Sequence, residues 1–530
     1  VSYPYDEQLT LKPLPANNLL ATFEFNLESK PLTSSDEITT YEVFPRALGP
    51  IIQSTNTKEL HLRFAQGWWD AECWGKLPLD GKHSGGTGVE IWLVIEAESQ
   101  DVAFSRWIEL VNGLSGLFCA SLNYINAAST AYPLTSFQPV NQTYVEVGKK
   151  YYFLRAALPS EPVCTENLTP FVKLLPTRGK QGVASLLDGH RLFDSQWHSM
   201  AIDIETKCDG ECVLAMAETI SSVIDVPRSL RTNKSRIPHP EKGDALRCDM
   251  SKTHNDWQCF PLGEATQVKW DLREIFGKQI IGTSALNAAS RVCVDVDPSW
   301  KVRAWSEQTV TDFSGCIDVP QTEFNVEFES ADSAVVSNFE LPPVMVSRSL
   351  TGSGQDNGGF RIVLTNPSTH EVSFNYFETL PWFVRVYLHS LKAEVAGKKG
   401  NFVRDIYYKP AIDRERPTQL ELAVVVPGES TLTITYGFDK SLLLYAEYPP
   451  DPNHGFEIEP AVISTREGYQ LRTTSLLLTL PLPDFSMPYN VIIMTSTVLA
   501  LTYGTVFNLI VKRTVLEAEA EAMAKKRGLA

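Results

Sequence analysis

The chain has 530 residues, of which 43% are apolar, and its formal net charge is -16 at pH 7. Length and apolar content predict two or more folded units with buried cores, because single cores rarely exceed about 250–300 residues. The acidic balance argues against nucleic acid as a partner, since proteins that bind it attract the phosphate backbone with a surplus of basic residues.

The first element with a clear pattern is an amphipathic helix. Its apolar residues recur at positions i, i+3, i+4, i+7 and i+11, namely Trp107, Leu110, Val111, Leu114 and Phe118. This spacing places all five on one helical face. We expect this face to pack on a β-sheet, because most other segments show the short apolar runs and turn residues that are typical of strands.

Three N-x-S/T sequons lie at Asn141, Asn167 and Asn233, whereas Asn366 is excluded by the proline that follows it. Each is a candidate N-glycosylation site, which would place this part of the chain in the secretory pathway. Sequons also arise by chance in a chain of this length. They therefore gain weight only together with the cysteine count and the apolar C-terminal segment.

The chain contains nine cysteines, an odd number. In an oxidising compartment they could form four pairs and leave one for another chain. Cys208 and Cys212 have the closest spacing, but a structural zinc site would need a second pair of ligands, so we expect no metal. The polar stretch 231–262 contains Cys248 and Cys259, which predicts a long loop or insertion held by a disulfide.

Short strands dominate the second part of the chain. They are predicted at 344–349, 360–364 and 383–388, with a glycine-rich loop at 351–359. Residues 420–438 hold an apolar run, a Pro427-Gly428 turn and a second run in which apolar residues alternate with threonines, as in a β-sandwich. The predicted fold class is therefore mainly β. We expect two β-sandwich-like units at 1–322, with added helices, and at 323–480, their boundary lying within 319–328.

The C-terminal segment 489–511 has no charged residue and is long enough for a helix to cross about 30 Å of hydrocarbon. Lys512 and Arg513 follow it, and such residues stay on the cytosolic side. This predicts one membrane helix, a lumenal N-terminal part and a cytosolic tail at 512–530, with a buried core helix as the alternative. Three prolines predict an extended collar at headgroup depth over 481–488.

Local motifs of the common catalytic classes are missing from the sequence. It has no G-x-S-x-G elbow, no H-E-x-x-H, no P-loop and no G-x-G-x-x-G. We therefore expect neither catalytic residues nor a cofactor. A nucleophilic Cys-His pair stays open, because nine cysteines and nine histidines could meet in the fold without a local pattern.

Four long irregular strings resemble those of a known family. They are F-C-A-S-L-N from Phe118, C-T-E-N-L-T-P from Cys164, D-P-N-H-G-F from Asp451 and D-F-S-M-P-Y-N-V from Asp484. Together they resemble the PIG-T family, the T subunit of glycosylphosphatidylinositol (GPI) transamidase. The string L-T-L-K-P-L-P from Leu9 extends the resemblance over nearly the whole chain.

The resemblance implies a subunit of an endoplasmic-reticulum membrane complex that cuts a proprotein's C-terminal signal and attaches GPI there. In this family the catalytic cysteine belongs to a caspase-like K subunit, so this chain would be non-catalytic and structural. Its partners would be the K subunit, the other subunits and the GPI lipid. From the residues alone, the rivals are an adhesion or lectin-like receptor and a membrane-anchored hydrolase.

The resemblance also implies that Cys164 forms a disulfide with the K subunit, an internal pair being the alternative. Eight cysteines then remain for internal disulfides. We expect these to be Cys208 with Cys212, Cys248 with Cys259, Cys293 with Cys316, and Cys73 with Cys119. Only the first two pairs rest on proximity in the sequence.

Polar residues in two of the strings are expected to face the GPI headgroup, because resemblance gives their positions and they can hydrogen-bond a glycolipid. They are Asn453, Asp484, Ser486 and Asn490. The alternative is that they cap the turn and the start of the helix.

Small and polar residues recur every four positions within the predicted span. They are Ser496, Ala500, Gly504 and Asn508. Such a stripe lies on one helical face and permits close packing in lipid, which predicts a neighbouring transmembrane helix.

Overall fold

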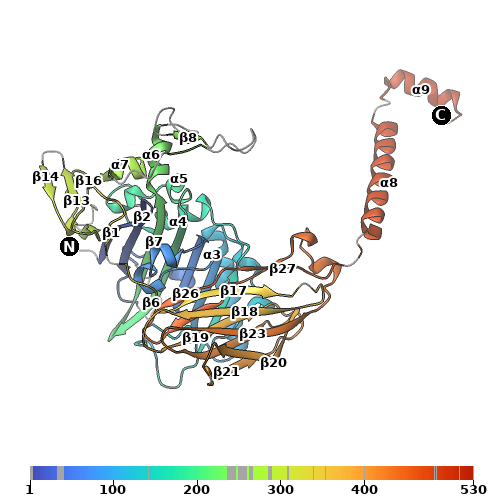
Figure 1. Cartoon of the computed structure of the whole chain (residues 1–530). Helices are drawn as coiled ribbons and strands as arrows, with labels where there is room; N and C mark the ends of the chain where they lie inside the picture. Colours follow the sequence, from blue (N-terminus) through green and yellow to red (C-terminus); the bar gives the residue numbers. More distant parts are fainter. Residues whose placement is uncertain are drawn as a thin grey trace.

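The computed structural model describes most of the chain as two β-rich units followed by a long helix (Figure 1). The described residues are 4–32, 41–140, 142–234, 246–248, 259–261, 267–283, 289–306, 309–337, 339–352, 354–398, 400–449, 451–482, 484, 486–511 and 514–528. Of 231–234, 246–248 and 259–261 only the backbone is described. The prediction of a mainly β protein is confirmed.

A nine-stranded sheet forms the centre of the first unit. Its spatial order is β15 (Gly315–Asp318), β12 (Ala289–Val294), β1 (Tyr5–Leu14), β2 (Asn18–Glu28), β7 (Glu211–Asp225), β6 (Trp197–Asp209), β3 (Thr57–Gly67), β4 (Gly88–Glu96) and β5 (Tyr151–Leu158). Neighbours are antiparallel except for β1 with β12. Strand β4 is buried along nearly its whole length, because the sheet is covered on both faces.

Helices cover one face of this sheet. They are α1 (Gly49–Ser54), α3 (Gln100–Phe118), α4 (Thr165–Leu174) and α5 (Gly189–Leu192). The helix predicted at 107–118 is confirmed as α3, whose five periodic apolar residues are all buried. Ser99 caps its start by accepting a hydrogen bond from the Val102 N–H.

A smaller sheet completes the first unit and moves the unit boundary. Its order is β10 (Val268–Asp271), β16 (Glu323–Ser330), β13 (Lys301–Ser306) and β14 (Thr309–Asp312), with β11 (Ile280–Ile281) beside β16. Phe324, Val326 and Phe328 of β16 join the same core as the helices. The boundary expected at 322/323 therefore lies after β16, because 323–330 alternates like any core strand and has no linker composition.

The second unit is a β-sandwich. One sheet contains β17 (Met345–Thr351), β18 (Asn357–Asn366), β23 (Ser430–Lys440) and β20 (Val384–Val395); the other contains β21 (Val403–Lys409), β22 (Thr418–Val426), β19 (Val372–Leu380), β25 (Val462–Thr465) and β26 (Gln470–Arg472). Inward residues of both sheets form one core. The loop predicted at 351–359 is the turn between β17 and β18.

The Pro427-Gly428 turn has a different role from that of a hairpin turn. It joins β22 to β23, which belong to different sheets, so the chain crosses the sandwich there. A Cβ at Gly428 would lie 2.1 Å from the carbonyl oxygen of Thr369. Glycine is required because the two backbones approach closely.

The C-terminal helix α8 (Ser486–Ile510) is exposed and apolar, with a mean hydropathy of 1.5, and could span a membrane by length and composition. It begins earlier than expected, so residues 486–488 belong to the helix and not to an extended collar. Pro488 fits there because the first turn of a helix makes no use of its N–H. A shorter helix, α9 (Glu517–Lys526), follows. Lys512 and Arg513 lie outside the described residues.

One carboxyl group in the first unit, that of Glu218, is buried without a hydrogen-bond partner among the described residues. Glu218 on β7 is completely buried, and neither of its carboxyl oxygens has a hydrogen-bond partner among the described residues. Burial raises the pKa of Glu218 well above its ordinary range. Burial therefore disfavours the charged form of this side chain in the folded protein.

Replacing Glu218 with methionine should raise the free energy of unfolding at pH 7 by about 1–3 kcal/mol, the usual cost of a buried polar group without a partner. The gain should shrink at acidic pH, because below the unfolded-state pKa both states hold the proton and the pH-dependent loss disappears. Denaturant titrations at pH 7 and pH 5 measure this. Replacing Glu218 with glutamine, which cannot ionise, should reproduce only the pH-dependent part of this gain in stability. If neither variant is more stable than the wild type, the interpretation that buried Glu218 destabilises the fold is contradicted.

Candidate functional site

Cys164 precedes the first turn of α4 and is a free, partly exposed thiol. Its N–H donates to the Oδ1 atom of Asn167 over 2.8 Å, and its carbonyl accepts from the Asn167 N–H over 3.0 Å. These two bonds form a reciprocal cap at the start of the helix. The thiol is therefore held at a fixed place on the surface.

The structure contradicts the prediction that Asn167 is a glycosylation site. Its side chain is 1% exposed, and its amide nitrogen donates to the carbonyl oxygens of Phe118 and Cys119 over 2.9 and 3.2 Å. A side-chain amide that is buried and fully bonded has no room for a glycan. This sequon instead joins the end of α3 to the start of α4, and Cys119 lies beside the Cys164 region.

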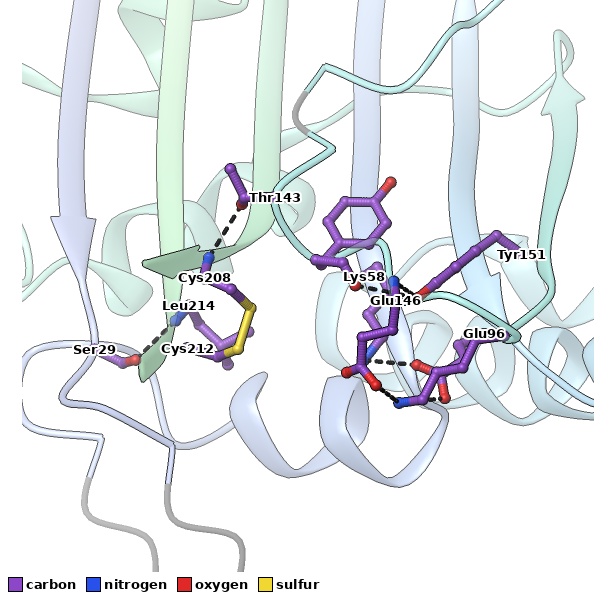
Figure 2. The surroundings of a disulfide bond; sticks show 11 residues. Ser29, Lys58, Glu96, Thr143, Glu146, Tyr151, Cys208, Cys212 and Leu214 are labelled. Atoms are coloured by element: carbon purple, nitrogen blue, oxygen red, sulfur yellow. Dashed lines mark hydrogen bonds and ion pairs between the residues drawn. A yellow bond between two sulfur atoms is a disulfide. The ribbon is translucent and has the colours of Figure 1, made fainter. Parts of the chain in front are cut away.

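The Cys208–Cys212 disulfide closes the tip of the β6–β7 hairpin, with its Cα atoms 4.1 Å apart. Figure 2 shows a loop from the neighbouring part of the first unit lying against this tip. Thr143, the hydroxyl residue of the first sequon, accepts a hydrogen bond from the Cys208 N–H over 3.1 Å. Asn141 itself and the side chain of Asn233 lie outside the described residues.

The same loop is fastened at its other end by charges. Lys149 forms ion pairs with Glu96 over 3.1 Å and with Glu146 over 3.0 Å, while the Glu146 N–H donates to the Tyr151 hydroxyl. Figure 2 draws Glu96, Glu146 and Tyr151 with this hairpin. The disulfide hairpin and the ion pairs thus hold the loop at both ends.

The remaining cysteines divide into bonded and free ones. Cys293 and Cys316 form a disulfide between β12 and β15, where they are opposite in register. The expected Cys73–Cys119 pair is wrong, because both are free and exposed. Cys73 belongs to α2 (Ala71–Trp74), whose neighbours pack with the second unit, whereas Cys119 ends α3 on the helix-covered face.

The insertion after α6 (Val226–Lys234) contains two short strands, β8 (Leu246–Cys248) and β9 (Cys259–Pro261). Their antiparallel pairing places Cys248 opposite Cys259 in register. The side chains of both lie outside the described residues, so their disulfide stays a prediction.

The residues expected at the lipid lie on two segments that meet near the start of α8. Strand β24 (Phe456–Ile458) pairs with β27 (Leu476–Leu478), which brings the loop containing Asn453 beside the chain that leads to the helix. The Tyr448 hydroxyl donates to the Pro481 carbonyl over 2.6 Å and fastens this chain from the other side. Asn453 is exposed, and its N–H donates to the Oδ1 atom of Asp451 over 3.0 Å.

Asp484 caps the helix in the structure. Its Oδ1 atom accepts from the Ser486 N–H over 2.9 Å, and hydrogen bonds from the Ser486 hydroxyl and N–H lower the pKa of Asp484 below its ordinary value. Ser486 and Asn490 lie in the first turns of α8, with exposed side chains. Capping accounts for one oxygen of Asp484 and leaves room for a second role.

The stripe predicted on the span lies along α8. Its members follow at intervals of four residues, so they occupy one face: Ser496, Ala500, Gly504 and Asn508. None of the membrane-length window is buried within the described structure. A Cβ built at Gly504 would meet nothing within 4 Å, so this face is open to another helix.

Buried ion pairs connect the two units. Arg155 on β5 contacts Glu90 and, across the interface, Glu459, each over 2.9 Å. From the second unit, the Nε atom of Arg472 donates to Glu90 over 2.8 Å. Burial would raise the pKa of the Glu90 carboxyl, but the guanidinium groups of Arg472 and Arg155 outweigh it and hold this pKa below its ordinary range.

A second contact between the units uses one carboxylate. Glu421 on β22 accepts hydrogen bonds from the backbone N–H groups of Leu134, Thr135 and Ser136, at 2.7 to 2.9 Å, and from the Thr135 hydroxyl. The Gln419 side-chain amide donates to the same group over 2.8 Å, and these five donors on one carboxylate make strong, charge-assisted bonds. The loop of the first unit is thereby fixed to the sheet of the second.

Two of the three free thiols among the described residues, those of Cys164 and Cys73, lie beside carboxylates. Burial and a hydrogen bond to Glu166 raise the pKa of the Cys164 thiol, and Asp70 raises that of Cys73. An activated cysteine needs a lowered pKa beside a cation or histidine. Neither Cys164 nor Cys73 has the lowered pKa of an activated nucleophile.

The whole sequence, residues 1–530, matches the family described as Gpi16 subunit, GPI transamidase component. The chain belongs to the Gpi16 family. It is 45% identical to the GPI transamidase component GPI16 of Saccharomyces cerevisiae, covering 99% of this chain and 91% of that protein. Identity is 34% to a PIG-T homolog of Schizosaccharomyces pombe and 31% to human PIGT, with 96% of this chain and 90% of each relative covered.

Membership of the Gpi16 family confirms the predicted resemblance to PIG-T and identifies the chain as similar to components of GPI transamidase. A component implies further subunits. The two units joined by the buried ion pairs therefore belong to a Gpi16-family protein that is part of a complex.

Proposed function

We propose that this Gpi16-family chain is the non-catalytic scaffold of a GPI transamidase in the endoplasmic-reticulum membrane. The buried ion pairs between Arg155, Glu90 and Glu459 support a rigid two-unit body, which suits a part that positions others. Thiols beside carboxylates support the assignment of catalysis to another chain.

Cys164 tethers the caspase-like catalytic subunit through an intersubunit disulfide. The observation that carries this is its state: a free, partly exposed thiol fixed by the buried Asn167 side chain. A covalent link makes reassociation effectively intramolecular, so a modest interface stays closed at any protein concentration. The tether needs an oxidising compartment, which agrees with the disulfides Cys208–Cys212 and Cys293–Cys316.

The orientation of the chain in the membrane follows from placing its disulfides in the oxidising lumen. Both β-rich units face the lumen, α8 crosses the membrane and α9 lies in the cytosol. The open stripe with Gly504 packs against a transmembrane helix of another subunit.

The GPI headgroup binds between the Asn453 loop and the start of α8. Pairing of β24 with β27 supports this, because it brings the loop beside the chain leading to Asp484, Ser486 and Asn490. Their hydroxyl, amide and carboxylate groups match the sugar, ethanolamine and phosphate groups of a glycolipid.

Replacing Asn453 or Asn490 with alanine should weaken GPI use in the assembled complex by about two- to tenfold each, as expected for one lost hydrogen bond. The measurement is transamidation of a reporter proprotein at limiting GPI by purified complexes. Asp484→Asn separates the roles of Asp484, because asparagine still caps the helix but has no charge.

We expect Asp484→Asn to lower GPI use while the complex assembles normally. Full transamidation with Asp484→Asn, Asn453→Ala and Asn490→Ala together would overturn the lipid contact and leave capping as the only role of Asp484.

A further inference from the structure

An exposed apolar surface lies next to the start of the membrane-length helix. It consists of Leu442, Leu444 and Tyr445, after the end of β23, and Leu482, before α8; we call it the apolar rim. Their exposed fractions are 71%, 61%, 54% and 41%. Soluble domains seldom gather large apolar side chains at such exposure without a partner.

The segment that carries the rim is held against the chain entering α8. At one end the Lys440 ammonium donates to the Thr479 hydroxyl over 3.3 Å, and at the other the Tyr448 hydroxyl donates to the Pro481 carbonyl over 2.6 Å. Between them Leu443 turns inward and packs on the core of the sandwich. Leu442 and Leu444 are therefore directed outward by the fold.

The distance to the start of α8 is short. Leu482 lies four residues before Ser486, where α8 begins, so the chain between them spans at most about 14 Å. The headgroup region on each side of a bilayer is itself about 5–8 Å thick. A helix that enters lipid at Ser486 therefore keeps Leu482 close to the headgroup layer.

The charges beside the rim fit this position. Glu447, two residues after Tyr445, is paired with Arg414, whose Nη2 atom donates to its Oε2 atom over 3.0 Å, so the charge of this carboxylate is compensated. Tyr445 has the amphipathic ring that is enriched at membrane interfaces.

We propose that the apolar rim dips into the lumenal headgroup layer of the membrane and fixes the sandwich against the bilayer. Its occupant is lipid, because the rim is continuous with the chain that enters α8. The contact would set the height and tilt of the second unit relative to the bilayer. This proposal depends on α8 crossing the bilayer, which is part of the proposed function, and it does not depend on any contact with GPI.

The test uses the full-length chain in phosphatidylcholine nanodiscs, with Cys73, Cys119 and Cys164 replaced by serine. A nitroxide is attached at Leu444→Cys, and its collision rates with oxygen and with a water-soluble nickel chelate are compared. The matched control is Ile406→Cys on β21, an edge strand away from α8 with an exposed fraction of 43% (Figure 1). Val498→Cys on α8 tests the premise that the helix is in lipid.

We expect the oxygen-to-nickel ratio at position 444 to be several-fold higher than at 406 and to approach that at 498. A ratio at 444 equal to that at 406, with a lipid-like ratio at 498, would overturn the rim alone. A water-like ratio at 498 would overturn its premise as well. Protection of 444 that appears only after the other subunits are added would contradict lipid as the occupant.

Discussion

Replacing Arg155 with methionine should lower the free energy of unfolding by about 3–5 kcal/mol, the usual effect of removing one partner from a buried ion pair. The variant leaves the Glu459 carboxylate at the interface without its cation and removes the stacking of the guanidinium on Phe377. Because Arg155 joins the two units, they should also separate more easily. Thermal melting and hydrogen exchange of β5 and β19 measure both effects.

Arg385→Met is the matched control, because its pair with Asp413 is exposed on both sides. Exposed pairs contribute less than about 1 kcal/mol, so this variant should melt close to the wild type. Adding Glu459→Gln to Arg155→Met should recover part of the loss, since it removes the unpaired charge. Equal melting temperatures for the Arg155 and Arg385 variants would contradict the role of the buried ion pairs.

Asn167→Ala should destabilise the first unit by about 2–3 kcal/mol, because it removes three hydrogen bonds of a buried side chain that contribute about 1 kcal/mol each. It also frees Cys164 from its cap and should loosen the start of α4. Denaturant unfolding measures the loss of stability, and hydrogen exchange of 164–170 measures the loosening.

Thr169→Ala distinguishes a buried amide from a glycan at this sequon. It destroys the sequon but removes only the bond from an exposed hydroxyl to the Thr165 carbonyl. Its stability should stay within about 0.5 kcal/mol of wild type, with no change in electrophoretic mobility. If Thr169→Ala migrates differently from the wild type, and this difference disappears after both are treated with glycosidase, Asn167 carries a glycan. That result would contradict its buried position.

The elements that sequence reasoning found are those with a complete local pattern. The five periodic residues from Trp107 to Phe118 define α3, since one helical face decides burial. Alternation defines β17, β18 and β23 of the sandwich in the same way. The boundary at 322/323 failed because β16 alternates as regularly as the strands after it, and sheet membership depends on distant partners.

The contacts between the units have no local pattern at all. Arg155, Glu90 and Arg472 come from β5, β4 and β26, far apart in the chain. The only hint was a charged residue in the middle of an apolar strand, as Glu90 is in G-V-E-I-W-L-V-I-E. A buried charge of this kind requires a partner, but the sequence does not say which.

The sequon at Asn167 failed for a related reason. N-x-T is the same string whether the asparagine is exposed or buried, so the motif does not report burial. Its position three residues after Cys164, directly before the apolar face of α4, is that of the N3 residue in a capping box. That spacing could have favoured the structural role.

The scaffold account depends most on the Cys164 tether. The measurement is non-reducing electrophoresis of the full-length chain, purified with its complex by an affinity tag, with mass spectrometry of each band. Wild type is compared with Cys164→Ser and with Cys119→Ser, the neighbouring free and exposed cysteine. We predict a heavier species that contains a caspase-like protease, disappears under reduction, is lost in Cys164→Ser and persists in Cys119→Ser. A band of single-chain mass in all three lanes would contradict the covalent tether.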